Sequence, residues 1–330
     1  MVVAHLRWFR PWTPTDLLRR GNLDPSWQLE IRLTTFVIVN PSAGRGRASR
    51  DIGKLVGAFS SVKPQQILET RASGDEATLA AKAIAAGAST IVVVGGDGTC
   101  SKIATAIIQS RAQCALAVVP AGTGNDFAKT LGVARATPDE VFRLVARRTT
   151  SRIDVGRADG RYFINSCGFG FDASVLAATQ TVRFLKGDAL YIYSALAQLF
   201  TYRALDVSID GALRGKGKNL LMAVASNGRS LGGAFRIAPT ASVTDGKLDF
   251  CLVSDTNVLG RVRTFAGALR GTHLDLPGVA SVKAESMSLT FAASPAMEMD
   301  GEIQQATSRT VRIECVPRAL TVVAAPGARL

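Results

Sequence analysis

The chain has 330 residues, of which 47% are hydrophobic and 20% charged, and this balance excludes an intrinsically disordered protein. Its net charge of +13 indicates a surface that attracts anions such as nucleotides, nucleic acids or an anionic membrane leaflet. No apolar run approaches the roughly 20 residues that span a bilayer, because the nearest candidate, residues 189–200, is too short. Five scattered cysteines without CxxC spacing are typical of reduced thiols in a cytoplasmic protein, and two distant histidines disfavour a histidine-based site.

Residues 1–33 differ from the rest of the chain. They contain all three tryptophans and show no helical or strand period, which predicts a poorly ordered extension. They also lack the continuous apolar segment of a secretory signal. Trp8, Phe9 and Trp12, beside Arg7 and Arg10, are compatible with contact to a membrane as well as with a passive extension.

Strands and helices alternate over residues 34–150, which we interpret as a nucleotide-binding α/β domain. Such alternation is typical of a parallel, Rossmann-like sheet with right-handed crossovers. Apolar, β-branched runs predict strands at 35–39, 66–70, 91–94 and 116–119, and the segments between them predict helices at 49–60, 75–86 and 102–108. Because ligands of these sheets bind at the carboxyl ends of the strands, we expect the polar loops to converge on one cleft.

Short strands separated by Gly and Asp turns predominate over residues 151–330. This pattern predicts a second domain that is mainly an antiparallel β-sandwich, with one helix at about 187–202. The extreme C-terminus is free to pack back on the first domain. The expected strands are 162–166, 205–209, 220–226, 247–253, 287–291, 310–315 and 319–323.

The most informative stretch is Gly95-Gly96-Asp97-Gly98-Thr99, which follows the expected strand 91–94. A glycine-rich turn between a strand and a helix places backbone N–H groups at a helix N-terminus, where phosphate binds. No Cβ obstructs the approach. Asp97 adds a carboxylate suited to a hydrated Mg²⁺ that bridges nucleotide phosphates, and Thr99 can hydrogen-bond a phosphate oxygen. Taken alone, the stretch is equally explained as a tight turn.

Further motifs occur in a fixed order around this turn. Asn40-Pro41-x-Ala43-Gly44-x-Gly46 precedes it and Pro120-x-Gly122-Thr123-Gly124-Asn125-Asp126-Phe127-Ala128 follows it. Downstream are Asn165-x-x-Gly168-Phe169-Gly170-Phe171-Asp172-Ala173, Asn227-Gly228, Gly232-Gly233-x-Phe235-x-Ile237-Ala238-Pro239, Asp245-Gly246-x-Leu248-Asp249 and Asp300-Gly301-Glu302. Each motif is weak alone, but the ordered set resembles the diacylglycerol kinase catalytic-domain family, which includes bacterial lipid kinases and sphingosine kinases. The resemblance covers about residue 34 to the C-terminus.

The resemblance implies an ATP-dependent lipid kinase that transfers the γ-phosphoryl group to a lipid hydroxyl with Mg²⁺. ATP would lie against the first domain, and the lipid would enter a cleft or pocket in the second. Diacylglycerol is the default acceptor; a sphingoid base, another glycerolipid and an isoprenoid alcohol stay open. The implied nucleotide site comprises Asn40, Thr70, Gly95, Gly96, Asp97, Gly98, Thr99, Cys100, Ser101, Gly122, Thr123, Asn125 and Asp126.

The implied catalytic base is Glu302, with Asp300 beside it and Asp97 at the phosphates. A lipid hydroxyl has a high pKa, so a carboxylate assists its attack, although Asp-Gly-Glu alone also fits a solvated turn. Likewise, Asn125-Asp126 alone could simply cap a helix.

The resemblance further implies a structural metal site at Ser242, Asp245 and Lys247, the first and last through backbone oxygens. Asp245-Gly246 is also a common hairpin turn, and a turn and a metal site can coincide.

Two positions depart from the family pattern. Lys102 and Thr105 stand where the family usually has an acid and an asparagine. Lys102 reverses a charge one turn from the phosphates, so it either helps to hold phosphate or signals an altered substrate or weakened activity.

Other functions stay open at this stage. An NAD kinase-like enzyme shares the Gly-Gly-Asp-Gly core, but Asn40-Pro41 and Asp300-Gly301-Glu302 argue against it. A non-catalytic nucleotide- or lipid-binding protein is favoured if Lys102 impairs the site. Nucleic acid is not an expected partner, because no motif interleaves basic and aromatic residues. We expect a cytoplasmic protein that is peripheral to the anionic inner leaflet, where each Lys or Arg contributes about 1 kcal/mol.

Overall fold

The computed structural model describes residues 34–44, 64–179 and 188–330. The expected extension, 1–33, and the expected helix at 49–60 lie outside the described residues. Residues 34–330 form a single compact unit.

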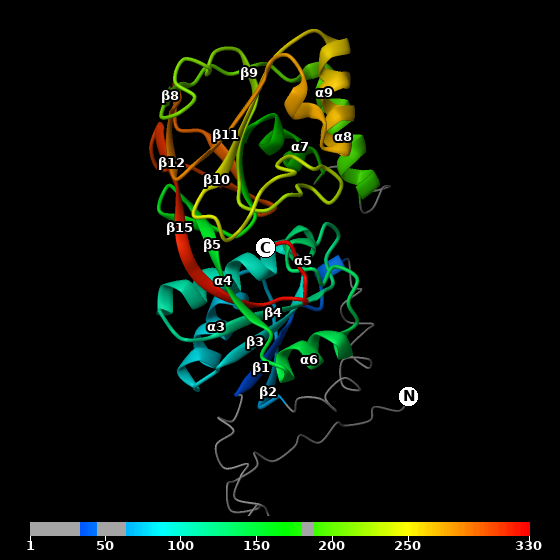
Figure 1. The fold of residues 1–330 in the computed structure, drawn as a ribbon, viewed down its shortest axis with the longest axis vertical. Helices are drawn as coiled ribbons and strands as arrows, with labels where there is room; N and C mark the ends of the chain where they lie inside the picture. Colours follow the sequence, from blue (N-terminus) through cyan, green and yellow to red (C-terminus); the bar gives the residue numbers. More distant parts are fainter. Residues whose placement is uncertain (1–33, 45–63, 180–187) are drawn as a thin grey trace, which may run out of the picture. The chain divides into compact units, whose positions relative to one another are not determined.

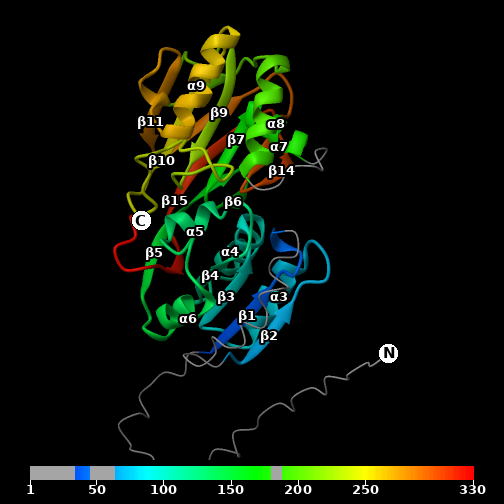
Figure 2. The same cartoon turned by 90° about the vertical axis from the view of Figure 1, so that its right-hand side faces the viewer.

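The N-terminal part is a parallel sheet covered by helices (Figure 1). Its strands lie in the order β2-β1-β3-β4, and β1 and β3 are buried along their whole length, as their β-branched sequences require. Figure 2 shows α3 and α6 on opposite sides of this sheet. The elements are β1 (Thr35–Val39), β2 (Gln66–Glu69), α3 (Asp75–Ala85), β3 (Thr90–Gly95), α4 (Asp97–Ser110), β4 (Ala115–Pro120), α5 (Asp126–Thr130) and α6 (Pro138–Ala146).

The C-terminal part contains a six-stranded antiparallel sheet in the order β11-β10-β9-β7-β13-β14. Its strands are β7 (Ser166–Gly170), β9 (Leu220–Ser226), β10 (Leu248–Ser254), β11 (Val279–Ala284), β13 (Ala296–Met299) and β14 (Glu302–Gln305). Three helices and a short 3-10 turn accompany it: α7 (Phe171–Thr179), α8 (Asp188–Thr201), α9 (Val258–Arg270) and η4 (His273–Asp275).

One long strand, β15 (Thr310–Val323), belongs to both parts of the molecule (Figure 1). It pairs in parallel with β4 through Thr321 and Val322, and antiparallel with β5 (Thr150–Ala158) and β12 (Ser286–Thr290). The N-terminal sheet therefore continues into the second half of the chain, where β6 (Arg161–Phe163) and β8 (Ser208–Asp210) complete its nine strands.

Three apolar cores result. The first surrounds the parallel sheet, and the second lies between the extended sheet and the six-stranded sheet. The third joins the six-stranded sheet to α7, α8 and α9. The predicted class, a parallel α/β domain followed by a mainly antiparallel β-sandwich, is confirmed.

Several element boundaries differ from the predictions. The expected strand 162–166 is divided into β6 and β7, because the N–H groups of Ile164 and Asn165 donate to Asp300 instead of a neighbouring strand. The expected strands 310–315 and 319–323 are one strand whose register shifts between Val316 and Leu320. Within the described residues the second half has three α-helices, of which the sequence predicted only α8.

Candidate active site

The glycine turn lies where predicted, between β3 and α4. Helix α4 begins at Asp97, earlier than the expected 102–108, and its N-cap, Gly96, offers no side chain to cap the first turn. The first-turn N–H groups and the positive end of the helix dipole are thus available to an anion. This arrangement is suited to bind phosphate.

A second glycine loop packs directly against the first. A Cβ built on Gly122 would lie 2.5 Å from the Cα of Gly96, so only glycine permits this approach. The Asn125 side chain closes the second loop, since its Oδ1 accepts from the Gly122 N–H at 2.9 Å and its Nδ2 donates to the Gly122 carbonyl at 3.1 Å. Asn125 is thus a loop-closing residue with a left-handed φ of 51°.

Asn40 joins a third loop to the same site. Its Nδ2 donates to the Thr99 Oγ1 at 2.9 Å, and its Oδ1 accepts from the Ser42 N–H at 3.0 Å. Its own N–H donates to the Val94 carbonyl. The loops after β1, β3 and β4 therefore meet at the carboxyl ends of their strands, as the sequence predicted.

Asp97 and Asp126 form an acidic pair behind the glycine loops. The Oδ1 of Asp97 accepts from the Phe127 N–H at 3.0 Å. Desolvation by burial, and next the charge of Asp126, raise the pKa of Asp97 to about 6. Asp126 is buried; its Oδ1 binds the Lys129 Nζ at 2.7 Å and its Oδ2 accepts from the Gly233 N–H at 2.9 Å.

Asp300 is buried and does not face the cleft, contrary to its predicted place beside a catalytic base. Its carboxylate accepts from the Ser101 hydroxyl at 2.6 Å and from three consecutive N–H groups, those of Ile164, Asn165 and Ser166. Burial raises its pKa and these four donors oppose that shift. Asp300 thus has a positioning role, because its hydrogen bonds attach the β13–β14 turn to α4 and to the segment at the start of β7.

Glu302, the predicted base, reaches the cleft at the start of β14. Its Oε1 lies 2.6 Å from the Nζ of Lys102 on α4. Lys102 also approaches the Ser73 hydroxyl at 3.4 Å. The unusual lysine is therefore the direct partner of the carboxylate that the family resemblance assigns as base.

These groups border an open polar cleft of about 570 Å³. Of the predicted nucleotide-site residues, the cleft is lined by Asn40, Thr70, Gly96, Gly98, Thr99, Gly122 and Thr123. Gly95, Asp97, Cys100, Ser101, Asn125 and Asp126 support these lining residues from behind rather than line the cleft.

The sequence missed one side of this cleft, the segment from Arg71 to Ser73 together with Glu76. This wall is fixed by local hydrogen bonds: Asp75 Oδ2 accepts from the N–H groups of Arg71 and Ala72, and Glu76 Oε2 accepts from the Gly74 N–H. The Ser73-Gly74-Asp75 helix entry was the signal that could have identified it.

The structure shows the surroundings of the residues predicted for a structural metal. Asp245 supplies the sole carboxylate of the set, and its Oδ2 lies 2.8 Å from the Nζ of Lys283 while its Oδ1 accepts from the Lys247 N–H. The Ser242 hydroxyl donates to the Leu330 carbonyl. Lys283 also contacts Asp249, so an ammonium group holds the Asp245 carboxylate here, and the metal site at Ser242, Asp245 and Lys247 stays a prediction. No cluster of three or more His, Cys, Asp or Glu suited to a metal occurs in the described ranges.

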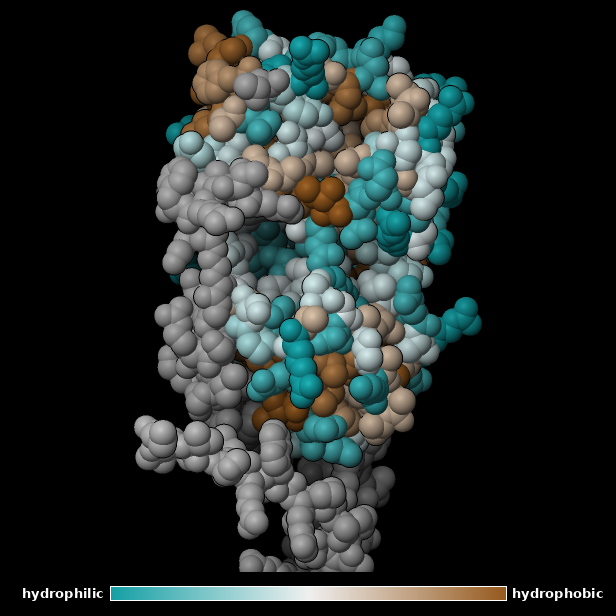
Figure 3. All heavy atoms as spheres, turned by 180° about the vertical axis from the view of Figure 1, so that it is seen from behind, coloured by the Kyte–Doolittle hydropathy of each residue, from teal (hydrophilic) through white to brown (hydrophobic). Residues whose placement is uncertain are grey.

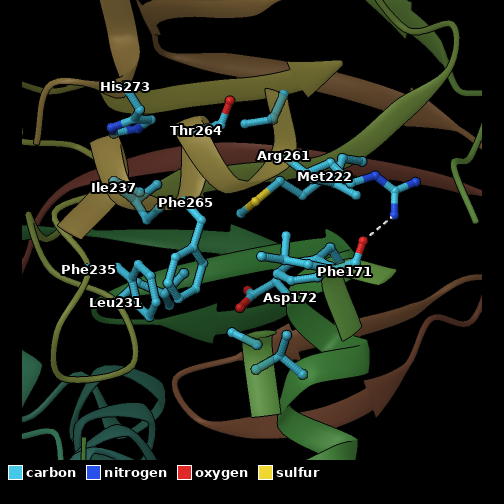
Figure 4. Close-up of a pocket in the computed structure, with 16 residues that line it drawn as sticks. Phe171, Asp172, Met222, Leu231, Phe235, Ile237, Arg261, Thr264, Phe265 and His273 are labelled. Carbon is cyan, nitrogen blue, oxygen red and sulfur yellow. Dashed lines mark hydrogen bonds between the residues drawn. The ribbon is translucent and has the colours of Figure 1, made fainter. Parts of the chain in front are cut away.

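A second cavity, of about 50 Å³, lies in the third core between the six-stranded sheet and the helices (Figure 4). Phe171, Met222, Leu231, Phe235 and Phe265 contribute to its apolar wall. At this volume it holds no complete acyl chain, so an occupant of that size would have to separate the helices from the sheet.

A polar chain connects this cavity to the Glu302 turn. Asp172 borders the cavity and lies near Glu298, whose Oε1 accepts from the Gly301 N–H at 2.5 Å. Burial raises the pKa of Glu298 well above its ordinary value, and the Asp172 charge adds to the shift. A Cβ on Gly168 would lie 2.0 Å from the Asp172 carboxylate, which explains the glycine there.

Together the fold and the cleft define a two-part protein with an α/β sheet that ends in glycine loops and a β-sandwich. The sequence model of the family described as "Diacylglycerol kinase catalytic domain" matches residues 34–158, and that of the "YegS C-terminal NAD kinase beta sandwich-like domain" matches residues 165–324. The chain belongs to the diacylglycerol kinase and YegS-like lipid kinase family.

Individual relatives agree with this assignment. A "Diacylglycerol kinase" of Bacillus subtilis (strain 168) is 27% identical over 270 residues, covering 81% of this chain and 88% of its own. A "Probable lipid kinase YegS-like" of Pseudomonas savastanoi pv. phaseolicola (strain 1448A / Race 6) is 30% identical over 261 residues, covering 76% and 80%. The structure titled "Crystal structure of a putative diacylglycerol kinase from Bacillus anthracis str. Sterne" has a TM-score of 0.72 at 25% identity, covering 90% of this chain and 98% of that one.

Proposed function

We propose that the protein is an ATP-dependent lipid kinase that phosphorylates a lipid hydroxyl, with diacylglycerol as the first acceptor to test. The observation that carries the proposal is the polar cleft, where two glycine loops and the N-terminus of α4 lie opposite Glu302. The names of the relatives from Bacillus subtilis and Pseudomonas savastanoi support the same class of reaction.

In this proposal the substrate is Mg·ATP, with its phosphates against the loops that contain Gly96 and Gly122. Glu302 accepts the proton of the lipid hydroxyl, whose oxygen forms a bond to the γ-phosphorus. The bond from that phosphorus to the β,γ-bridging oxygen breaks, and ADP leaves with the electron pair. Positioning and charge neutralisation supply most of the rate enhancement in such transfers. In the same proposal Lys102, which pairs with Glu302, would contact the transferred phosphoryl group.

The lipid would occupy the apolar cavity beside Phe171 and Phe265 after the helices move apart. Its hydroxyl end would point toward Asp172, because the Asp172–Glu298–Gly301 chain leads from the cavity to Glu302. Association with an anionic membrane surface from the cytoplasmic side is part of the proposal, since the chain has a net charge of +13. None of the helices in the described part is long and apolar enough to cross a bilayer.

The test is transfer of labelled phosphate from Mg·ATP to diacylglycerol and to a mixed bacterial lipid extract. Wild type is compared with Glu302→Gln, which keeps the side-chain shape and removes the base. We expect a labelled lipid from wild type and at least a hundredfold lower rate from the variant, in the range of a lost general base. Equal rates in the two proteins would refute the role of Glu302, and no labelled lipid from any acceptor would refute the kinase assignment.

A second candidate function, nucleotide binding without turnover, is favoured by the Lys102–Glu302 ion pair alone. The Lys102 ammonium occupies the Oε1 of Glu302 at 2.6 Å, which leaves that oxygen less accessible to a substrate hydroxyl. ATP binding measured by calorimetry, together with the absence of any labelled product, would identify this second function.

A further inference from the structure

Exposed apolar side chains are concentrated on two helices. Leu259 on α9 is 77% exposed and Phe200 on α8 is 63% exposed. Figure 3 shows brown side chains at its upper left, where the half turn from Figure 1 brings α8 and α9. Of the eight exposed large hydrophobic residues in the described ranges, these two helices supply six: Tyr193, Leu196, Phe200, Val258, Leu259 and Val262.

Both helices carry exposed apolar side chains in addition to those that line the cavity. Tyr193, Leu196 and Phe200 follow helical spacing and form one exposed stripe on α8, whereas Ala195 and Leu199 line the apolar cavity. On α9 the exposed residues stand at the start, and Phe265 and Ala268 line the same cavity further along. A helix in contact with water on its outer face is normally polar there, so a second apolar phase is expected to cover it.

The end of α8 and the start of α9 lie next to each other, because Arg261 joins the two helices. Its Nη1 donates to the Leu199 carbonyl at 2.6 Å, the contact drawn in Figure 4, and its Nη2 donates to the Tyr202 carbonyl at 3.0 Å. Asp255 neutralises this guanidinium at 2.7 Å. The end of α8 and the start of α9 thus form one surface, here called the α8–α9 surface, with the six exposed apolar residues at its centre.

Cations surround this surface. The Asp255 N–H donates to the Asn219 carbonyl at 2.7 Å, which places Lys218 beside the start of α9. The neighbouring acids are engaged: Asp210 with Arg214, and Asp206 with the Asn219 N–H. Four exposed cations on or next to these elements form no ion pair with any described residue: Arg203, Lys216, Lys218 and Arg263.

We propose that the α8–α9 surface is the membrane-docking face, which inserts its apolar side chains into an anionic lipid bilayer while the four cations contact the headgroups. This inference rests on the proposed function, since the same two helices enclose the cavity assigned to the lipid. Apolar residues with flanking Lys and Arg are typical of helices that lie at a bilayer interface. A second copy of this chain fits less well, because a two-fold contact would bring the same cations face to face.

The test is co-sedimentation of the full chain with phosphatidylcholine vesicles that contain or lack phosphatidylglycerol, without ATP. We expect Phe200→Ser/Leu259→Ser to weaken binding to anionic vesicles by at least about tenfold, in line with the loss of two buried apolar side chains. Lys216→Gln/Lys218→Gln is expected to weaken it by about thirtyfold at low salt, from about 1 kcal/mol for each lysine. The matched control, Ile67→Ser, alters a residue that is 41% exposed on β2 and should bind as wild type does.

Wild-type affinity in the Phe200/Leu259 variant would overturn the proposal. So would a loss of binding caused only by Trp8→Ser/Trp12→Ser in the N-terminal residues. Far-UV circular dichroism verifies that the variants fold, and Leu259→Ala provides a milder change if the double variant does not fold.

Phosphate transfer in detergent micelles is measured in parallel, because it reports on the kinase assignment alone. Vesicle binding without micelle activity supports membrane docking and refutes the kinase proposal. Micelle activity without vesicle binding supports the kinase proposal and refutes membrane docking.

Discussion

Three carboxylates near the cleft have different surroundings, although the sequence presents them as equivalent acids in glycine turns. Asp300 is enclosed by four donors and positions the turn that follows it. Asp97 is confined behind the glycine loops and has a raised pKa. Glu302 alone borders the cleft, where Lys102 contacts it. Environment rather than residue type therefore distinguishes a positioning role from a chemical one.

Asp97 should make folding stability depend on pH. Its pKa is about 6 in the folded protein against an ordinary 3.8, so the folded state binds this proton more tightly than the unfolded state. The stabilisation from the protonated group is complete below about pH 4 and is lost as the pH rises through 6. Asp97→Asn should therefore gain stability relative to wild type between pH 4 and pH 7, by at most about 3 kcal/mol. Urea unfolding of both proteins at the two pH values measures the difference, and a constant difference would contradict the pKa shift.

Lys102 should matter for activity and hardly for stability. The Lys102–Glu302 pair is partly exposed, and such pairs contribute roughly 0–1 kcal/mol to folding. Lys102→Met should thus unfold within about 1 kcal/mol of wild type. If Lys102 contacts the transferred phosphoryl group, kcat/KM should fall about tenfold or more through the lost charge-assisted hydrogen bond. Lys102→Arg is the control that keeps the charge, and unchanged kcat/KM in Lys102→Met would exclude the contact.

At the scale of elements, the contact between two glycine loops decides the shape of the phosphate site. In Gly122→Ala the new Cβ would meet the Gly96 backbone, which cannot yield as a flexible side chain can. We expect a loss of about 1–3 kcal/mol in unfolding free energy, the usual cost of overpacking, and weaker ATP binding as the loops separate. Gly98→Ala is the matched control for stability, because its nearest neighbour is the flexible Glu302 side chain at 3.4 Å. Thermal unfolding with and without Mg·ATP tests both variants, and equal stabilities would contradict the argument.

The elements that could be predicted from the sequence are those whose pattern is local. The strands β1, β3 and β4 are buried apolar runs that end in glycine or polar loops, and helix α4 follows β3 almost directly. Short strands such as β13 and β14 were missed, because their residues alternate weakly and their pairing partners are distant in the sequence.

In the candidate site, too, the features with a local sequence pattern could be predicted and the contacts between distant segments could not. The glycines predicted where the loops lie, because a turn that closely contacts phosphate or another backbone leaves no room for a Cβ. The partners of Lys102 and Asp300 could not be predicted, because each contact joins segments that meet only after the second half of the chain has folded. Sequence patterns therefore located the glycine loops that border the cleft but not the ionic partner of the proposed base.

At the scale of the whole molecule, β15 joins the two sheets' cores in one strand. Its first residues face the second core, where Val311 and Ile313 are buried, and its last residues face the first core, where Leu320 and Val322 are buried. The edge of β4 is covered by this strand rather than by a neighbour in sequence. The parallel sheet and the second core are consequently completed by the same strand, so we expect them to unfold together.

Leu320→Ala tests this coupling. The side chain is buried in the first core, and its truncation should cost about 2–5 kcal/mol of unfolding free energy. If β15 couples the two parts, calorimetry should show a single transition in wild type, with equal calorimetric and van't Hoff enthalpies, that moves as a whole to lower temperature in the variant. Amide exchange in β9 and β10 should accelerate as well, although both strands lie in the other sheet. A variant in which only the first core melts earlier, while β9 and β10 keep their protection, would show that the bulge between Val316 and Leu320 separates two independent folding units.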